Sequence, residues 1–132
     1  MTAVTATLHR STFLRRVLQV DAATCAAMGA LLFVDAGALE PLLGLPAALL
    51  KYSGVGLFPV AAFILLVATR ATLPRSGVWL VILGNAAWVA ASASLLGFVA
   101  PTAIGYAFVV GQAFATAVLA VLEYAGLHQA AA

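Results

Sequence analysis

Residues 76–122 read SGVWLVILGNAAWVAASASLLGFVAPTAIGYAFVVGQAFATAVLAVL, a stretch without a single Asp, Glu, Lys, Arg or His residue. It is too long for one membrane-spanning helix, which needs about 20 apolar residues to cross about 30 Å of hydrocarbon. Pro101 lies within the stretch and blocks the continuation of a helix. The sequence therefore predicts two spans here, at about 77–99 and 102–124, joined by a very tight turn.

Two similar apolar blocks precede this stretch, at about 17–34 and 46–69. Pro46 suits the first turn of a helix, where its missing N–H would have no partner anyway. The blocks are continuously apolar, whereas a transmembrane barrel needs alternating strands, and lipid cannot satisfy free backbone groups. We therefore expect an all-α polytopic membrane protein, a four-transmembrane-helix bundle that forms one domain over residues 1–132.

The composition supports lipid as the solvent of this fold. The chain is 65% hydrophobic and 8% charged, whereas soluble domains contain about 25% charged residues. Asp21 interrupts the apolar core that a cleavable signal would need, so we expect the first helix to be retained. The net charge of +2 arises at the ends of the spans and forms no basic face, so no nucleic-acid partner is expected.

The positions of the basic residues predict an orientation. Short loops rich in Lys and Arg stay in the cytoplasm. Placing the N-terminus there puts five of the six basic residues inside, namely Arg10, Arg15, Arg16, Arg70 and Arg75. The opposite side receives Asp35, Glu40 and Lys51. With four crossings, both termini are then cytoplasmic.

The chain contains the signs of an internal repeat. Residues 21–32, DAATCAAMGALL, match residues 85–96, NAAWVAASASLL, at six of twelve positions, and place Asp21 opposite Asn85. A duplicated helical hairpin would explain the match and would form a parallel repeat about an axis along the membrane normal. The shared alphabet of alanine-rich membrane helices explains it equally well, so both explanations stay open.

Small residues recur every four positions in three of the spans, and such rows let helix backbones approach closely. The rows are Ala22, Ala26 and Ala30, with Ala23 and Ala27 beside them; Ala86, Ala90 and Ser94; and Ala107, Gly111 and Ala115. We expect them to pack the four helices of one chain together. The alternative is that they hold copies of the chain in a homo-oligomer.

Three polar residues inside the spans are the candidate site: Asp21, Asn85 and Gln112. Asp21 lies about 7 Å along the helix axis from Arg16, close to the inner boundary, which favours pairing with Arg15, Arg16 or Arg75. Intramembrane acids also mark ion pathways, so a proton or cation site is the alternative. Asn85 and Gln112 lie deeper, where the two amides could hydrogen-bond to each other.

Residues that would indicate catalysis are missing from the sequence. His9 and His128 lie outside the spans, so they form no intramembrane pair for haem. The sequence shows no metal-spaced cluster, no phosphate loop and no nucleophile motif. We therefore expect a protein that is not an enzyme, with no catalytic, cofactor or metal site.

The segment LLGLPAALL at 42–50, with Gly54, Pro59 and the NAAW motif at 85–88, resembles a group of small, uncharacterised four-span proteins of bacterial inner membranes. The resemblance covers about residues 15–126 and implies a multi-pass protein of the bacterial cytoplasmic membrane. Small multidrug-resistance transporters also have one acid in their first helix. The residues around Asp21 do not match the glutamate motif of those transporters.

Two functions follow from these features. The first is a non-enzymatic integral membrane protein that serves as an accessory or scaffold subunit, either as a homo-oligomer or within a larger membrane complex. The second is a small transporter with a polar site at Asp21, Asn85 and Gln112.

Overall fold

The computed structural model describes residues 2–131, and the side chains of residues 12–130. Its helices are α1 (Thr2–Val34), α2 (Ala36–Leu43), α3 (Ala47–Ala68), α4 (Arg75–Leu95) and α5 (Ala103–Ala131), and residues 2–131 contain no strand. The four long helices are each long and apolar enough to cross a membrane. The chain is an all-α, multi-pass membrane protein with a four-helix bundle, as predicted.

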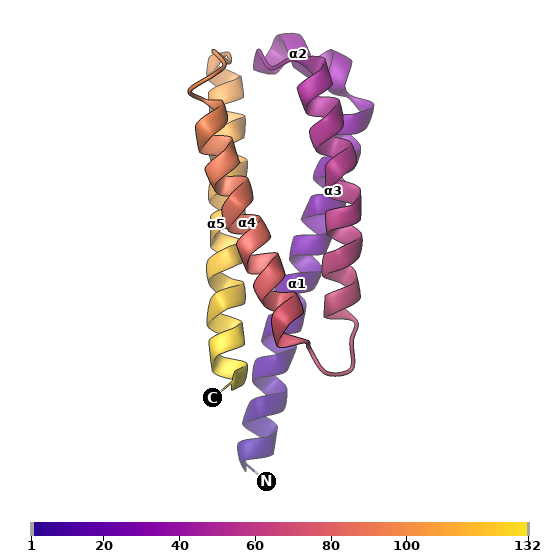
Figure 1. Ribbon diagram of the computed structural model, residues 1–132, viewed down its shortest axis with the longest axis vertical. Coiled ribbons are helices and arrows are strands. Elements are labelled where there is room, and N and C mark those ends of the chain that lie inside the picture. The colour runs from indigo at the N-terminus through magenta and orange to yellow at the C-terminus, as the bar shows by residue number, and fades with distance from the viewer. Residues whose placement is uncertain (1, 132) are drawn as a thin grey trace.

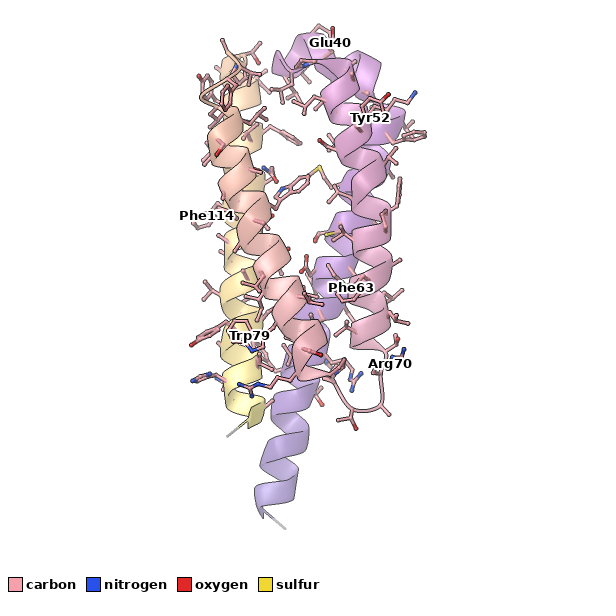
Figure 2. The ribbon with its side chains drawn as sticks, viewed as in Figure 1. Glu40, Tyr52, Phe63, Arg70, Trp79 and Phe114 are labelled. Atoms are coloured by element: carbon pink, nitrogen blue, oxygen red, sulfur yellow. The ribbon has the colours of Figure 1, made fainter. Side chains whose placement is uncertain are left out.

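The long helices run up and down the bundle (Figure 1). Both ends of the chain and the α3–α4 connection lie at one end of the molecule, which we call the basic end because Arg15, Arg16, Arg70 and Arg75 lie there. Helix α2 crosses the opposite end (Figure 1). Tyr52 and Glu40 lie at that opposite end, whereas Trp79 and Arg70 lie at the basic end (Figure 2).

The predicted connection at 36–45 contains a helix that the sequence did not suggest. Helix α2 buries Ala36 and Leu43 against the bundle, and this burial stabilises a short helix that would be marginal alone. Gly44 ends it with a left-handed φ of 69°, and its N–H donates to the carbonyl of Glu40 at 2.8 Å. The segment after Gly44 leads directly into α3.

The ends of the long helices differ from the predicted spans. Helix α4 ends at Leu95 instead of near residue 99, and turns at Gly97 and Phe98 replace its last turn. Helix α5 continues to Ala131 instead of ending near residue 124, because Leu127 is buried in the core beside Leu14 and Leu18. Helix α1 begins at Thr2, well before the predicted residue 17.

The helices associate as two pairs. Helix α1 packs along α3, and α4 packs along α5, so each predicted hairpin forms a pair. The pairs meet mainly where α1 packs on α5, whereas α3 and α4 barely touch. At the end opposite the basic end, the N–H and hydroxyl of Thr102 donate to the carbonyls of Leu43 at 3.0 Å and Leu42 at 2.7 Å. The two pairs are therefore joined along one side and open along the other.

The predicted use of the small-residue rows is wrong for most of their members. Ala22 is buried, but the other members are exposed: Ala23, Ala26, Ala27, Ala30, Ala86, Ala90, Ser94, Ala107, Gly111 and Ala115. The close α1–α3 contact forms at Gly29 and Gly54, where a Cβ on Gly54 would lie 2.8 Å from the Gly29 carbonyl oxygen. Larger side chains such as leucine, valine and isoleucine fill the remaining core, so the alanine rows face outwards.

Candidate functional site

Three buried polar side chains from three helices meet inside the bundle. Asp21 of α1, Asn85 of α4 and Glu123 of α5 are 1%, 6% and 0% exposed. The amide Nδ2 of Asn85 donates one hydrogen bond to Asp21 Oδ2 at 2.8 Å and another to Glu123 Oε1 at 2.7 Å. A single amide therefore bridges two carboxyl groups; we call these three residues the acid–amide cluster.

The cluster lies at one level of the bundle, because Asn85 bonds to both carboxyl groups. Asn85 follows the start of α4 at Arg75, and Glu123 precedes the end of α5 at Ala131. At 1.5 Å per residue, these two residues lie about 12–15 Å from the basic ends of their helices. The carboxyl groups are thus held inside the bundle, about two turns or more from the ends of α4 and α5.

The predicted pairing of Asp21 with an arginine is wrong. Cys25 Sγ donates to Asp21 Oδ1 at 3.6 Å, and Asn85 donates to the other oxygen. The guanidinium of Arg15 is turned towards the end of α3 and donates to the carbonyl of Ala68 and to those of Arg70 and Ala71 in the following connection. Carbonyls at the C-terminal end of a helix attract a cationic donor, and among the described side chains no arginine is left to pair with Asp21.

One oxygen of the cluster has no hydrogen-bond donor among the described residues. Glu123 Oε2 is fully buried, and its sister oxygen takes the bond from Asn85. The amide nitrogen of Asn85 lies 2.8 Å from Asp21 Oδ2 and 2.7 Å from Glu123 Oε1, so the two carboxyl groups are close neighbours. Burial of an unpartnered carboxylate oxygen is costly, so this geometry favours a bound proton or cation between the two carboxyl groups.

Gln112, the third predicted site residue, belongs to a separate hydrogen-bond network. Its Oε1 accepts from Trp88 Nε1 at 2.7 Å, and its Nε2 donates to Ser92 Oγ at 3.0 Å and to the Val109 carbonyl at 2.9 Å. The predicted bond between Asn85 and Gln112 is therefore wrong, because both amides find closer partners. The indole of Trp88 obtains the acceptor that a buried N–H requires.

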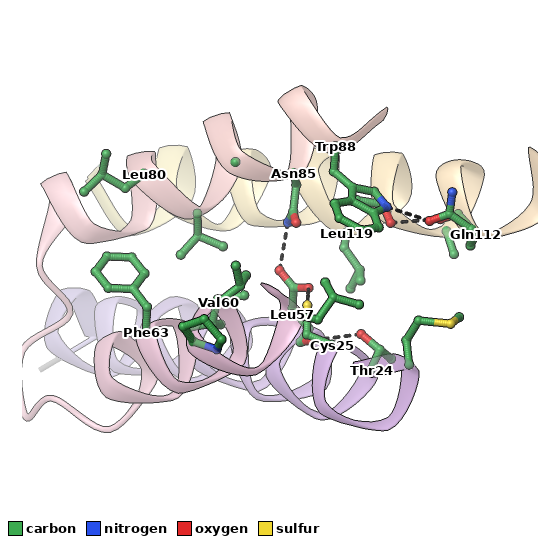
Figure 3. Close-up of a pocket in the computed structure, with 18 residues that line it drawn as sticks. Thr24, Cys25, Leu57, Val60, Phe63, Leu80, Asn85, Trp88, Gln112 and Leu119 are labelled. Atoms are coloured by element: carbon green, nitrogen blue, oxygen red, sulfur yellow. Dashed lines mark hydrogen bonds between the residues drawn. The ribbon is translucent and has the colours of Figure 1, made fainter. Parts of the chain in front are cut away.

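Both networks border one cavity of about 660 Å³ between the helix pairs. All four long helices line it, with Asp21, Thr24, Cys25, Met28, Leu57, Pro59, Val60, Phe63, Ile64, Leu80, Val81, Gly84, Asn85, Trp88, Gln112, Ala115, Thr116 and Leu119 (Figure 3). Val60 and Phe63 on α3 and Leu80 on α4 are 44%, 39% and 60% exposed. The cavity therefore opens along the α3–α4 side, where the helix pairs barely touch.

The chemistry of the cavity follows from these residues. Asp21 is the one carboxylic acid among the described residues that line it, and no Lys, Arg or His stands among them. No group of three or more His, Cys, Asp or Glu residues with the arrangement of a metal site occurs in the described part of the chain. The arrangement can hold a small cation or a proton beside an apolar chamber.

Sequence reasoning missed Glu123. The predicted fourth span ended near residue 124, so Glu123 lay in its last turn and was not among the candidate residues. The signal that could have found it is Leu127, an apolar residue one turn further on that extends the hydrophobic face of the helix. With that extension, Glu123 lies at the depth of Asp21 and Asn85.

Comparison with protein-family models, with curated proteins and with solved structures found no match to this chain.

Proposed function

We propose that this protein is a small, non-enzymatic transporter of the bacterial cytoplasmic membrane, in which the acid–amide cluster binds a proton. The observation that carries the proposal is the pair of fully buried carboxyl groups on one amide, beside a cavity of about 660 Å³ that opens between α3 and α4. Asp21 and Asn85 of the predicted polar site belong to this proposed proton site, and Glu123 joins them.

The cluster favours one bound proton. Two ionised carboxylates beside each other in hydrocarbon would repel strongly, and each would also lose its hydration. One bound proton removes this repulsion, because a single amide nitrogen holds Asp21 Oδ2 and Glu123 Oε1 close to each other. The pair then carries a single negative charge.

Proton release would change the charge of the cavity wall from one negative charge to two. A bound solute senses this change because Asp21 and Asn85 line the cavity directly. A ligand can shift an equilibrium only by its different affinity for the two states, and the change of charge supplies that difference. Proton binding and solute binding are therefore coupled at this site.

Proteoliposomes containing a pH-sensitive dye test the proposal. A pH gradient is imposed with the membrane potential clamped, and solutes of different charge are added outside. We expect at least one solute to dissipate the gradient through the wild-type protein, whereas Asp21→Asn and Glu123→Gln abolish the effect. Asp35→Asn is the matched control, because Asp35 is exposed near α2 and far from the cavity. Equal rates in the cluster variants and wild type would contradict the proposal, as would a wild-type protein that responds to no solute.

The proposed orientation places both termini in the cytoplasm. The support is the basic end, where Arg15, Arg16, Arg70 and Arg75 lie together with both ends of the chain. Reporter fusions at Ala38 and at the C-terminal segment test it. Activity of a periplasmic reporter at the C-terminal segment would contradict this orientation.

A second candidate is an accessory subunit of a membrane assembly. The exposed rows on α1, α4 and α5 favour it, because small residues on a lipid-facing surface allow close helix contact with another chain. Co-purification in mild detergent distinguishes the two functions. A stable partner that is lost in Ala90→Leu, with transport unaffected by the cluster variants, would support the accessory role.

A further inference from the structure

We infer that the cavity takes an amphiphilic organic monocation, an ammonium or phosphonium with an apolar body, which arrives through the opening between α3 and α4 and displaces the proton of the acid–amide cluster. The inference rests on the proposed function and names the class of solute that it requires. Three independent features of the cavity carry it: its shape, its charge and its aromatic side chains.

The shape of the cavity fits a small organic molecule. Ligand sites commonly have volumes of about 300–1,000 Å³ and mostly apolar walls with a few polar groups. The cavity of about 660 Å³ lies in this range, and apolar side chains form most of its wall. An inorganic ion would leave such a chamber largely unfilled, so its size indicates a ligand with an apolar body.

The charge of the cavity selects a cation. The ionisable groups that face the cluster are Asp21 and Cys25 from α1 and Glu123 from α5, whereas the residues of α3 and α4 that line the cavity are uncharged. On α1, Arg15 is held by the carbonyls of Ala68 and of the connection after α3, and Arg16 is exposed. The carboxyl groups would repel an anion, and they would give a neutral ligand no electrostatic attraction.

Aromatic rings lie at both ends of the cavity. Phe63 of α3 lies at one end and Trp88 of α4 at the other, with Asn85 between them (Figure 3). Asp21 accepts a hydrogen bond from Asn85. The indole N–H of Trp88 is held by Gln112, which fixes the orientation of the ring. Aromatic faces attract organic cations, and tryptophan does so most strongly.

The exchange balances in charge and atoms. The protonated cluster carries one negative charge, and it releases one proton when one monocation binds. The carboxyl O–H bond breaks, the proton leaves to water, and no oxidant, reductant or other reactant is involved. The cluster together with its bound ion therefore has the same net charge before and after the exchange.

Equilibrium binding of radiolabelled tetraphenylphosphonium to the detergent-purified protein tests the inference, with an indicator dye that reports released protons. We expect about one proton released per cation bound, and by linkage an affinity that falls about tenfold for each unit of decreasing pH while the pair holds its proton. Asp21→Asn and Glu123→Gln should each weaken binding at least tenfold. Neutral triphenylphosphine oxide should compete at least tenfold less well than the cation.

A pair of glycine variants separates cavity binding from binding to the outside of the bundle. Gly84 lines the cavity with open space around its Cβ position, so Gly84→Leu should fill the chamber and abolish binding while the carboxyl pair remains intact. Gly56 also has open space but does not line the cavity, so Gly56→Leu should bind as the wild type does.

Several outcomes would overturn the inference. Equal competition by the neutral compound, or tetraphenylphosphonium binding unchanged in both cluster variants, would show an apolar groove that takes lipid chains. Equal loss in Gly84→Leu and Gly56→Leu would place the ligand outside the cavity. No binding by the wild type, together with cluster-dependent dissipation of a pH gradient by another solute, would refute the organic cation and leave the proposed transporter standing.

Discussion

Asn85→Ala should destabilise the bundle more than any other removal of a neutral polar group. The substitution deletes the amide that donates to both Asp21 at 2.8 Å and Glu123 at 2.7 Å. Both carboxyl groups stay buried after the change, and neither gains a new donor from the protein. The loss therefore includes two hydrogen bonds and the cost of two poorly satisfied acids in hydrocarbon.

The expected loss is about 2–3 kcal/mol in the free energy of unfolding. Hydrogen bonds to charged groups contribute about 1.5–3 kcal/mol each in soluble proteins. Side-chain bonds in membrane proteins average about 0.6 and reach about 1.7 kcal/mol each, so two bonds in the upper half of that range together give about 2–3 kcal/mol. Ser92→Ala is the control, because Ser92 is also buried but accepts one bond from the neutral Gln112. Its loss should be about 0.6 kcal/mol.

Reversible unfolding in mixed micelles with increasing dodecyl sulfate, followed by far-ultraviolet circular dichroism, measures both values. Adding Glu123→Leu to Asn85→Ala should recover about 1 kcal/mol, since removing a partnerless buried charge is favourable. The reasoning is refuted if Asn85→Ala loses no more stability than Ser92→Ala does. It is also refuted if the second substitution makes the Asn85→Ala protein less stable.

The same unfolding assay checks three further predictions. Gly54→Val should cost about 1–3 kcal/mol, because its side chain would collide with the backbone of Gly29 and push α1 from α3; Gly56→Val, into open space, should cost clearly less, and equal losses would count against the close α1–α3 contact. Arg15→Lys should lose about 1–2 kcal/mol, since the guanidinium reaches the three carbonyls from two separate nitrogens, whereas the donors of an ammonium all lie on one nitrogen. The exposed Arg16→Lys should stay within about 0.5 kcal/mol of wild type, and a similar loss in both would be inconsistent with this role. Thr102→Val should cost about 1 kcal/mol by removing the hydroxyl that donates to Leu42, and an unchanged stability would show that this contact is dispensable.

The sequence predicted the spans because hydropathy depends on composition along the chain, but it predicted the helix ends poorly. Helix ends depend on contacts with other helices. Helix α5 continues past residue 124 because Leu127 packs beside Leu14, which is distant in the sequence. Helix α2 forms because the bundle covers Ala36 and Leu43, and nothing within residues 36–45 indicates that cover.

The candidate site was predicted in part. Counting residues from Arg16 gave Asp21 a depth along one helix, but depth does not show which neighbour faces the side chain. The rotation of α1, α4 and α5 about their axes decides that Asp21 meets Asn85 and Glu123 instead of an arginine. The alignment of residues 21–32 with 85–96 had placed Asp21 and Asn85 in equivalent positions, and the structure places them in contact.

The open α3–α4 side has a consequence for the affinity that the cavity needs. Its mouth, at Val60, Phe63 and Leu80, lies between helices that are long and apolar enough to span a membrane, so the proposed solute would reach it after partitioning into the bilayer. Each additional methylene of a solute favours the hydrocarbon by about 0.8 kcal/mol, so two of them raise its concentration there roughly tenfold. A cavity fed from this enriched phase can be half-filled at low aqueous concentration even when its own contacts are weak. Weak contacts also allow rapid release, which favours turnover over retention.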